Sequence, residues 1–249
     1  ARITGSPLDT LVSFEAGEEA RAAAEEYWGL DKPVHVQYFK FIGNAVQGKF
    51  GDSMKWRMPA MDLIKDRFVN TVQLAGLSVL VATVVAIPIG VLSAIKKDSP
   101  IDYIGKIVAL LGQSAPPFWV GLLLMWIFAV ELDLVQTSGK GGFPSFILPA
   151  TALGLFWVAA LMRLMRSAML DVLDSEYVKL ARIKGLSEWK VICKHVLRNA
   201  AIAPLTFFGI ILGNLLLGSV SVETVFAWPG MGFLAFEAVF IRDYTLIQA

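Results

Sequence analysis

Long uncharged runs alternate with short charged segments along most of the chain. Four runs, at 71–95, 107–130, 141–162 and 199–222, contain no Asp, Glu, Lys or Arg. A helix that spans a bilayer needs about 20 apolar residues at a rise of about 1.5 Å each, and every run reaches that length. The third run is the weakest, because 141–146 has the composition of a loop. The pattern predicts an all-α fold, a polytopic transmembrane helical bundle.

The first 70 residues are mixed and polar, and they predict short helices rather than spans. The expected elements are a helix at 21–29, a helix at 34–46, a loop at 48–53 and an interfacial helix at 62–70. We therefore divide the chain into an external region at 1–70, for which we expect no activity, and a transmembrane domain at 71–249.

Composition supports a membrane protein and excludes several other classes. Hydrophobic residues make up 56% of the 249 positions, against about 45–50% in soluble domains. The net charge of +1 gives no general field for binding nucleic acid. The single cysteine, Cys193, permits no internal disulfide. No P-loop motif occurs, so the chain does not bind ATP by that route.

Two adjacent prolines lie inside the second run. Pro116 and Pro117 each lack a backbone donor, which kinks a helix and frees a carbonyl that neighbouring helices must cover. Such a kink can shape a solute pathway, or it can serve packing alone. Packing is the more common role.

Charge between the runs predicts which ends face the cytoplasm. Segment 163–198 carries eight basic and four acidic residues, and 96–106 carries three basic and two acidic. Segments 131–140 and 223–243 are net acidic. Because cytoplasmic loops are enriched in Lys and Arg, the first two are predicted to be cytoplasmic and the last two external, which places 1–70 outside by parity.

The most polar stretch of the second half, at 176–199, predicts a helical hairpin. Gly185 separates two sets of apolar residues at helical spacing, and a glycine just past a helix adopts the left-handed conformation readily. Ser187 can cap the following helix. The two sets are Leu173, Tyr177, Leu180 and Ala181, then Trp189, Ile192, Cys193, Val196 and Leu197. Composition alone favours a simpler interpretation, a solvated cytoplasmic loop that obeys the positive-inside rule.

The order of residues in the hairpin is more specific than its composition. Lys-x-Ala-x-x-x-Gly at 179–185, preceded by Glu176-Tyr177 and followed by Leu186-Ser187, resembles the cytoplasmic "EAA" loop of ABC importer permeases. With the His-Val-Leu-Arg-Asn-Ala that begins at His195, it is similar to the oligopeptide/dipeptide/nickel branch. This chain departs from the name of the motif, since its first two positions are Lys and Leu.

In that family the loop docks a short helix into a groove of a cytoplasmic ATPase subunit. The resemblance implies that Ala181 and Gly185 lie at this contact and that charged side chains surround it. The loop residues that we assign to ATPase coupling are Glu176, Tyr177, Lys179, Ala181, Arg182, Lys184, Gly185 and Leu186.

A second stretch resembles the same branch. It is the motif Val-Glu-Thr-Val-Phe-x-Trp-Pro-Gly-Met-Gly at 222–232, which is similar to a motif of that branch. In that branch the motif lies on the external side, between the last two spans. Its candidate residues are Glu223, Trp228, Pro229 and Gly230, which can close the outer mouth or contact a binding protein. An interfacial anchor is the alternative. The resemblance also implies six spans, the first before Ala1 and the last beginning near Ala249, so we expect the chain to be a fragment or a protein that lacks both terminal spans.

The resulting hypothesis is the permease subunit of a type I ABC importer in the plasma (inner) membrane of a bacterium or archaeon. It implies a di- or oligopeptide as solute, with glutathione or nickel as other members of the branch. The expected partners are cytoplasmic ATP-binding subunits, a second permease subunit in a heterodimer, an external solute-binding protein and the lipid bilayer. No catalytic residue, metal site or cofactor is expected in this chain, and ATP belongs to the partner.

Two other classes are disfavoured by the residues. An ion-coupled transporter or channel usually places ionisable side chains within its spans, and the four runs hold none. An intramembrane enzyme needs a nucleophile with a base, paired carboxylates or metal ligands at membrane depth. His35 and His195, the two histidines, are far apart and lie outside the runs.

Overall fold

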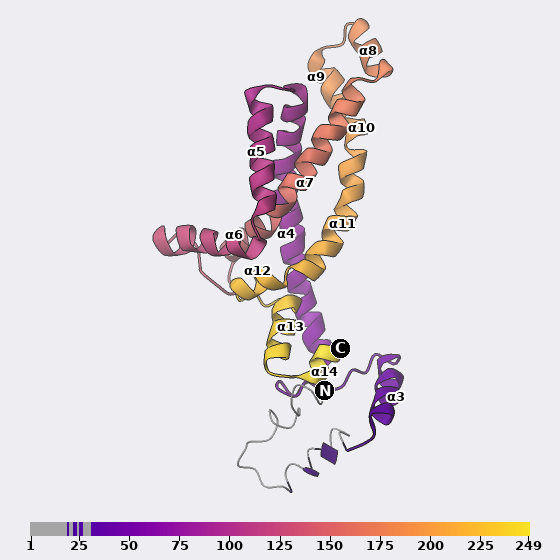
Figure 1. Cartoon of the computed structure of the whole chain (residues 1–249), viewed down its shortest axis with the longest axis vertical. Coiled ribbons are helices and arrows are strands. Elements are labelled where there is room, and N and C mark those ends of the chain that lie inside the picture. Colours follow the sequence, from indigo (N-terminus) through magenta and orange to yellow (C-terminus); the bar gives the residue numbers. More distant parts are fainter. Residues whose placement is uncertain (1–18, 20–21, 24, 27–30) are drawn as a thin grey trace. The chain divides into compact units, whose positions relative to one another are not determined.

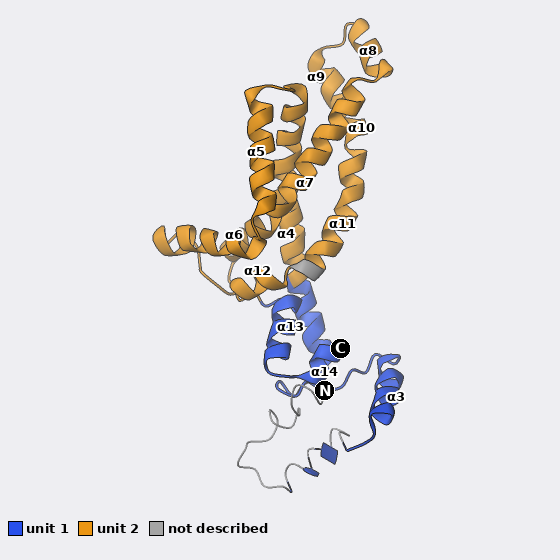
Figure 2. Cartoon of the chain, in the orientation of Figure 1, with its two compact units in different colours: residues 1–70, 229–249 blue, residues 71–228 orange. Residues whose placement is uncertain are grey.

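The computed structural model describes residues 19, 22–23, 25–26 and 31–249, and they form an all-helical fold (Figure 1). Within these residues no strand forms, and one isolated bridge pairs Asp52 with Pro59. The all-α prediction is confirmed. The helix expected at 21–29 falls largely outside the described residues. Contacts divide the chain into two compact units, residues 1–70 with 229–249 and residues 71–228 (Figure 2). The division into an external region and a transmembrane domain concerns membrane sides and stays a prediction.

The helices follow the runs of the sequence closely, with short breaks. Their bounds are α3 Val34–Ala45, α4 Ala60–Ile95, α5 Pro100–Ser114, α6 Pro117–Leu124, the π-helical turn η1 Met125–Glu131, the 3-10 turn η2 Phe143–Phe146, α7 Ile147–Leu173, α8 Glu176–Ile183, α9 Glu188–Lys190, the π-helical turn η3 Val191–Val196, α10 Leu197–Ala200, α11 Ile202–Gly218, α12 Val220–Val225, α13 Met231–Phe240 and α14 Tyr244–Gln248. The helix predicted at 34–46 is confirmed as α3. The helix predicted at 62–70 and the first apolar run form one helix, α4, because residues 62–75 contain no proline or glycine.

Two of the four runs lie in helices long and apolar enough to cross a membrane. These are Ala60–Ile95 and Phe143–Leu173, and two bent helix pairs bring the total to four if each pair is one span. The kink expected at Pro116 and Pro117 is confirmed and is large, because α5 and the α6–η1 segment meet at an angle of 101°. Pro116 and Pro117 explain the bend. Neither can donate to the preceding turn, and Pro117 begins α6 at the position where proline fits best.

Helix α7 is the centre of the larger unit. It contacts α5, α6, α10, α11 and α12, and α4 lies against it so closely that Gly154 has no room for a side chain. Ala152, Leu153 and Leu161 of α7 pack with Leu74 and Ala82 of α4 in the main core. Near the end of α7, Met165 and Met169 are fully buried in a second cluster. This second cluster joins α7 to the hairpin.

The smaller unit has a core of its own. Ala60 and Leu63 of α4 pack with Leu234 and Ala238 of α13 and with Leu246 of α14. The buried Asp243 carboxylate accepts hydrogen bonds from the Ser53 hydroxyl and from the backbone N–H groups of Lys55 and Leu246. The segment before α4 is therefore fixed to the C-terminal helices by both apolar and polar contacts.

Candidate functional site

The hairpin, residues 176–199, has the helix–turn–helix form that its sequence predicts. Helix α8 ends at Ile183, and Gly185 takes a φ of +78°. The Gly185 N–H donates to the Arg182 carbonyl at 2.9 Å and the Leu186 N–H to the Ala181 carbonyl at 3.4 Å. This pair of bonds is the Schellman arrangement, which satisfies the last carbonyls of a helix and favours glycine at its left-handed position. Ser187 stands at the N-cap of α9, but its side chain makes no capping bond.

The inner face of the hairpin packs against the chain's own helices. Val178 has no exposed surface and Ala181 is 6% exposed. They lie in one cluster with Met165 and Met169 of α7 and with Val191, Ile192 and Val196 of the returning arm. Ala181 thus packs largely into the hairpin's own core, and its place at the contact with an ATPase subunit stays a prediction.

The outer face carries the large apolar side chains that the inner face does not use. Tyr177 and Leu180, which the sequence groups with Ala181 in one apolar set, are 45% and 51% exposed. Ile183 is 81% exposed, Leu186 38% and Trp189 75%. We call these five residues the outer face of the hairpin. Contiguous exposed apolar side chains bordered by charges are typical of an interaction surface. Ile183 was not singled out in the sequence, although it lies three residues after Leu180.

Charged residues border this outer face. Arg182 donates through two nitrogens to the Glu188 carboxylate, at 2.7 and 3.2 Å, and so joins α8 to α9 across the turn. The Glu176 carboxylate accepts a hydrogen bond from the Lys179 ammonium at 2.8 Å. This bond raises the pKa of Lys179 above its usual value. Lys184 is exposed beside the turn. These pairs are open to solvent, so they fix the geometry of the hairpin more than its stability.

In the second candidate stretch, at 222–232, the Glu223 side chain is buried and makes hydrogen bonds inside the protein. Its side chain has no exposed area and accepts hydrogen bonds from the Thr71 hydroxyl of α4 at 2.8 Å and from the Ser219 hydroxyl at 2.9 Å. Its carbonyl accepts from the Trp228 N–H at 2.8 Å. Ala227, with a φ of +45°, is the left-handed residue that ends α12. Glu223 thus fixes α12 to α4 and begins the turn.

Trp228 is fully buried in the larger unit. Its ring meets the Phe146 ring edge to face, with 4.5 Å between centroids. The Lys140 ammonium lies 5.8 Å from each of the two ring centroids and donates to the Gln73 side chain at 2.9 Å. A partner cannot contact the indole in this conformation, so any effect of Trp228 on a partner acts through the loop that it supports.

Pro229 and Gly230 belong to the smaller unit. The Pro229 carbonyl accepts from the Asn70 side-chain amide at 2.7 Å. Gly230 is buried at the N-cap of α13 with a φ of −101°, a conformation open to any residue. The role of these residues at an outer mouth, like a pathway role for Pro116 and Pro117 at the α5–α6 bend, stays a prediction.

Replacing Trp228 with alanine is expected to disrupt the loop at 223–230 and thereby to lower the transport that the resemblance implies. The change removes the whole ring from a packed site, at a cost of about 3–5 kcal/mol. Trp228→Phe keeps an aromatic partner for Phe146 and should retain most activity. The measurement is uptake by each variant at matched membrane levels. Wild-type uptake by Trp228→Ala would show that the loop does not depend on the ring.

The sequence of this chain is similar to one protein family and to permease proteins of bacterial transport systems. Residues 86–249, which include the hairpin and the stretch at 222–232, match the family described as "Binding-protein-dependent transport system inner membrane component". The chain is 39% identical over 247 residues to the glutathione transport system permease protein GsiC of Salmonella paratyphi A, covering 99% of this chain and 81% of that protein. GsiC of Escherichia coli (strain K12) is 38% identical over the same shares.

Two solved structures share the fold. One is the MetNI methionine ABC transporter in an inward-facing conformation, with a TM-score of 0.59 and 16% identity over 76% of this chain and 88% of that one. The other is an amino acid ABC transporter with histidines, with a TM-score of 0.55 and 18% identity over 75% and 83% of the two chains. At these identities the likeness establishes the fold alone.

Proposed function

The chain belongs to the family of binding-protein-dependent transport system inner membrane components, and we propose that its hairpin is the surface on which an ATP-hydrolysing subunit acts. It is a permease subunit of an ABC importer, and its role is transport rather than catalysis. The observation that supports the proposal is the outer face of the hairpin. Five large apolar side chains are exposed along α8, the turn and α9, and two ion pairs border them.

The proposed mechanism uses the packing of the hairpin. Because its inner face is continuous with the core at the end of α7, a push on the outer face displaces α7 as well. Packed helices tend to switch between discrete arrangements rather than deform continuously, so such a push can alternate access between the two sides. ATP binds and is hydrolysed on the partner, and this chain requires no cofactor of its own.

The full set of partners is proposed from the family. It comprises cytoplasmic ATP-binding subunits on the hairpin, a second permease subunit in the membrane and an external solute-binding protein. The family's description supports the last of these directly, since its transport depends on a binding protein. The charge bias supports a cytoplasmic location for 96–106 and 163–198, where the ATPase subunits would contact the hairpin. A bacterial inner membrane is the proposed location.

For the solute we propose a small peptide, with glutathione as the specific candidate. Glutathione is a tripeptide, and the Salmonella and Escherichia coli relatives are named as glutathione permeases. Selection is expected to reside mainly in the binding protein, because the four uncharged runs of this chain offer no ionisable side chain that would distinguish solutes.

Reconstitution tests both the function and the solute. The chain, its companion permease, the ATPase subunits and the binding protein are placed in liposomes, and uptake of labelled glutathione, a dipeptide and Ni²⁺ is compared. We expect ATP-dependent uptake of glutathione or the dipeptide that is lost without the binding protein. Uptake of Ni²⁺ alone would contradict the peptide assignment, and uptake driven by an ion gradient without ATP would contradict the importer.

A further inference from the structure

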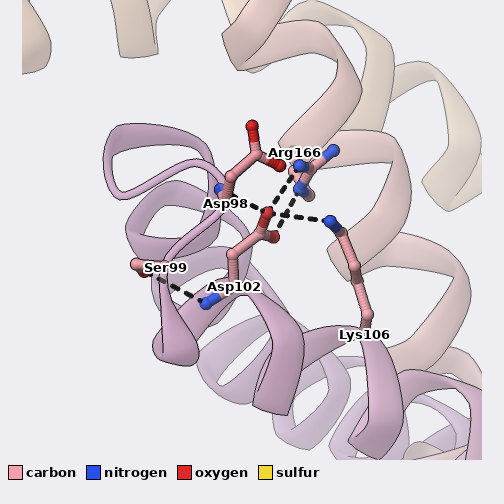
Figure 3. A network of polar contacts seen from close by, with 5 residues as sticks. All are labelled: Asp98, Ser99, Asp102, Lys106 and Arg166. Atoms are coloured by element: carbon pink, nitrogen blue, oxygen red, sulfur yellow. Dashed lines mark hydrogen bonds and ion pairs between the residues drawn. The ribbon is translucent and has the colours of Figure 1, made fainter.

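A buried ion pair joins α5 to α7 close to the hairpin. The Asp102 carboxylate, which has no exposed surface, accepts from Arg166 Nε on one oxygen and from Arg166 Nη2 on the other, both at 2.7 Å (Figure 3). It also accepts from the Lys106 ammonium at 2.9 Å and from the Asp98 backbone N–H at 3.1 Å. Two parallel N–H bonds to a carboxylate fix direction as well as distance.

This arrangement resists separation of the two helices. Arg166 is itself largely buried, with 18% of its side chain exposed. Pulling α5 away from α7 would leave a charge inside the protein without its partner, which is far more costly than losing an exposed pair. Asp102 and Arg166 therefore hold the first turn of α5 against α7. We call these two residues the α5–α7 joint.

The third helix at this place is not bound in the same way. Gly105 of α5 faces Ser93 of α4 so closely that an added Cβ would lie 2.7 Å from the Ser93 hydroxyl. That hydroxyl is buried and has no hydrogen-bond partner among the described residues. Helix α5 thus touches α4 without a polar bond at this point, whereas it is bonded to α7. The polar link of α5 at this point is therefore to α7 and not to α4.

The joint lies between the hairpin and the bend. Arg166 is flanked by Met165 and Met169, which are fully buried in the cluster that holds Val178 and Ala181 of the hairpin. Asp102 lies in the first turn of α5, and the far end of α5 is the 101° bend before α6. The 15 residues of α5 rise about 1.5 Å each, so the helix extends about 22 Å from its first turn to the bend.

We propose that Arg166 and Asp102 transmit displacement of the hairpin from α7 to α5, and through α5 to the bend at Pro116. Arg166 and Asp102 are positioning residues in this role, since neither needs to contact solute or ATP. The proposal rests on the proposed function, because it assumes that an ATPase moves the hairpin. It differs from a purely structural ion pair in one measurable respect, the amount of solute moved per ATP hydrolysed.

The test uses the reconstituted complex with two single variants. Arg166→Lys keeps the positive charge but cannot make the two parallel hydrogen bonds to the carboxylate, and Asp102→Asn removes the negative charge. Both should still bring the ATPase subunit along in a pull-down, because the hairpin is unchanged. Solute transported per ATP should fall about fivefold or more, a typical lower bound for coupling between sites. Lys106→Gln, which removes the more exposed contact to the same carboxylate, should change that ratio by less than about twofold.

The neutral double variant Asp102→Asn with Arg166→Gln separates coupling from stability. It removes both buried charges, so the penalty for an unpaired charge disappears and the thermal stability of the complex should approach that of wild type. We expect it to remain uncoupled. Three results would each overturn the proposed role of the α5–α7 joint. The first is restored coupling in the double variant, and the second is a normal ratio of solute transported to ATP hydrolysed in both single variants. The third is uptake and hydrolysis that fall together with the amount of assembled complex. Absence of ATP-driven uptake in wild type would instead overturn the proposed function on which it rests.

Discussion

Replacing Ile183 with aspartate is expected to abolish stable association with the ATPase subunit while the hairpin and the membrane helices stay folded. The Ile183 side chain is 81% exposed, so its loss removes almost no internal packing. At a partner surface the same change places a charge where an apolar contact is needed. Losing such a central contact costs about 2 kcal/mol or more, which corresponds to an affinity loss of roughly 30-fold. Trp189→Asp, also on the outer face, should act in the same direction.

Matched variants separate docking from folding. Val34→Asp on α3 makes a comparable change at a side chain that is 70% exposed, and it should leave ATPase binding unchanged. Ala181→Asp introduces the same charge into the buried inner face, so it should open the hairpin to protease as well as weaken binding. The measurement is ATPase recovery in a pull-down together with proteolysis of the hairpin. Full recovery with both Ile183→Asp and Trp189→Asp would refute the docking surface.

Replacing Gly154 with alanine is expected to destabilise the larger unit, although alanine normally favours a helix. An added Cβ at this position would lie 2.8 Å from the Ser78 carbonyl oxygen and 3.2 Å from the Val81 side chain, both on α4. A backbone oxygen cannot move aside as a flexible side chain can. The helices must separate, at a cost of about 1–3 kcal/mol.

Gly76 supplies the matched control for this prediction. It lies on α4 with no atom within 4 Å of a would-be Cβ, so Gly76→Ala should be neutral or should raise stability by up to about 1 kcal/mol. The thermal midpoint of each purified variant in detergent gives the comparison. Equal midpoints for Gly154→Ala and Gly76→Ala would show that α4 and α7 do not approach each other as closely as the structure has them.

The hairpin shows where sequence reasoning succeeds and where it stops. The turn at Gly185 could be predicted because only a left-handed residue ends α8 in this way. The sequence did not predict which face of α8 is buried. Val178 and Ala181 form one stripe with a spacing of three, and Tyr177, Leu180 and Ile183 form another. Periodicity alone does not say which stripe contacts the chain itself and which is left for a partner.

The other differences from expectation have local causes that composition does not reveal. Pro116 and Pro117 predict a kink, but the angle of 101° depends on what α6 packs against, namely α7 and α12. Ala227 takes the left-handed position that ends α12, although alanine is not a residue that favours this conformation. Asp102 and Arg166 are separated by 64 positions, and no pattern within either helix predicts that they meet.

Cross-linking from position 183 tests the central claim most directly. A single cysteine at this position, in a Cys193→Ser background that removes the one native thiol, is exposed to a short thiol-to-amine cross-linker in membranes that contain the complete complex. The account predicts a cross-link to the ATPase subunit and no reaction with an impermeant thiol reagent added outside intact cells. Reaction with that external reagent, or the absence of any cross-link in a complex that transports solute, would contradict it.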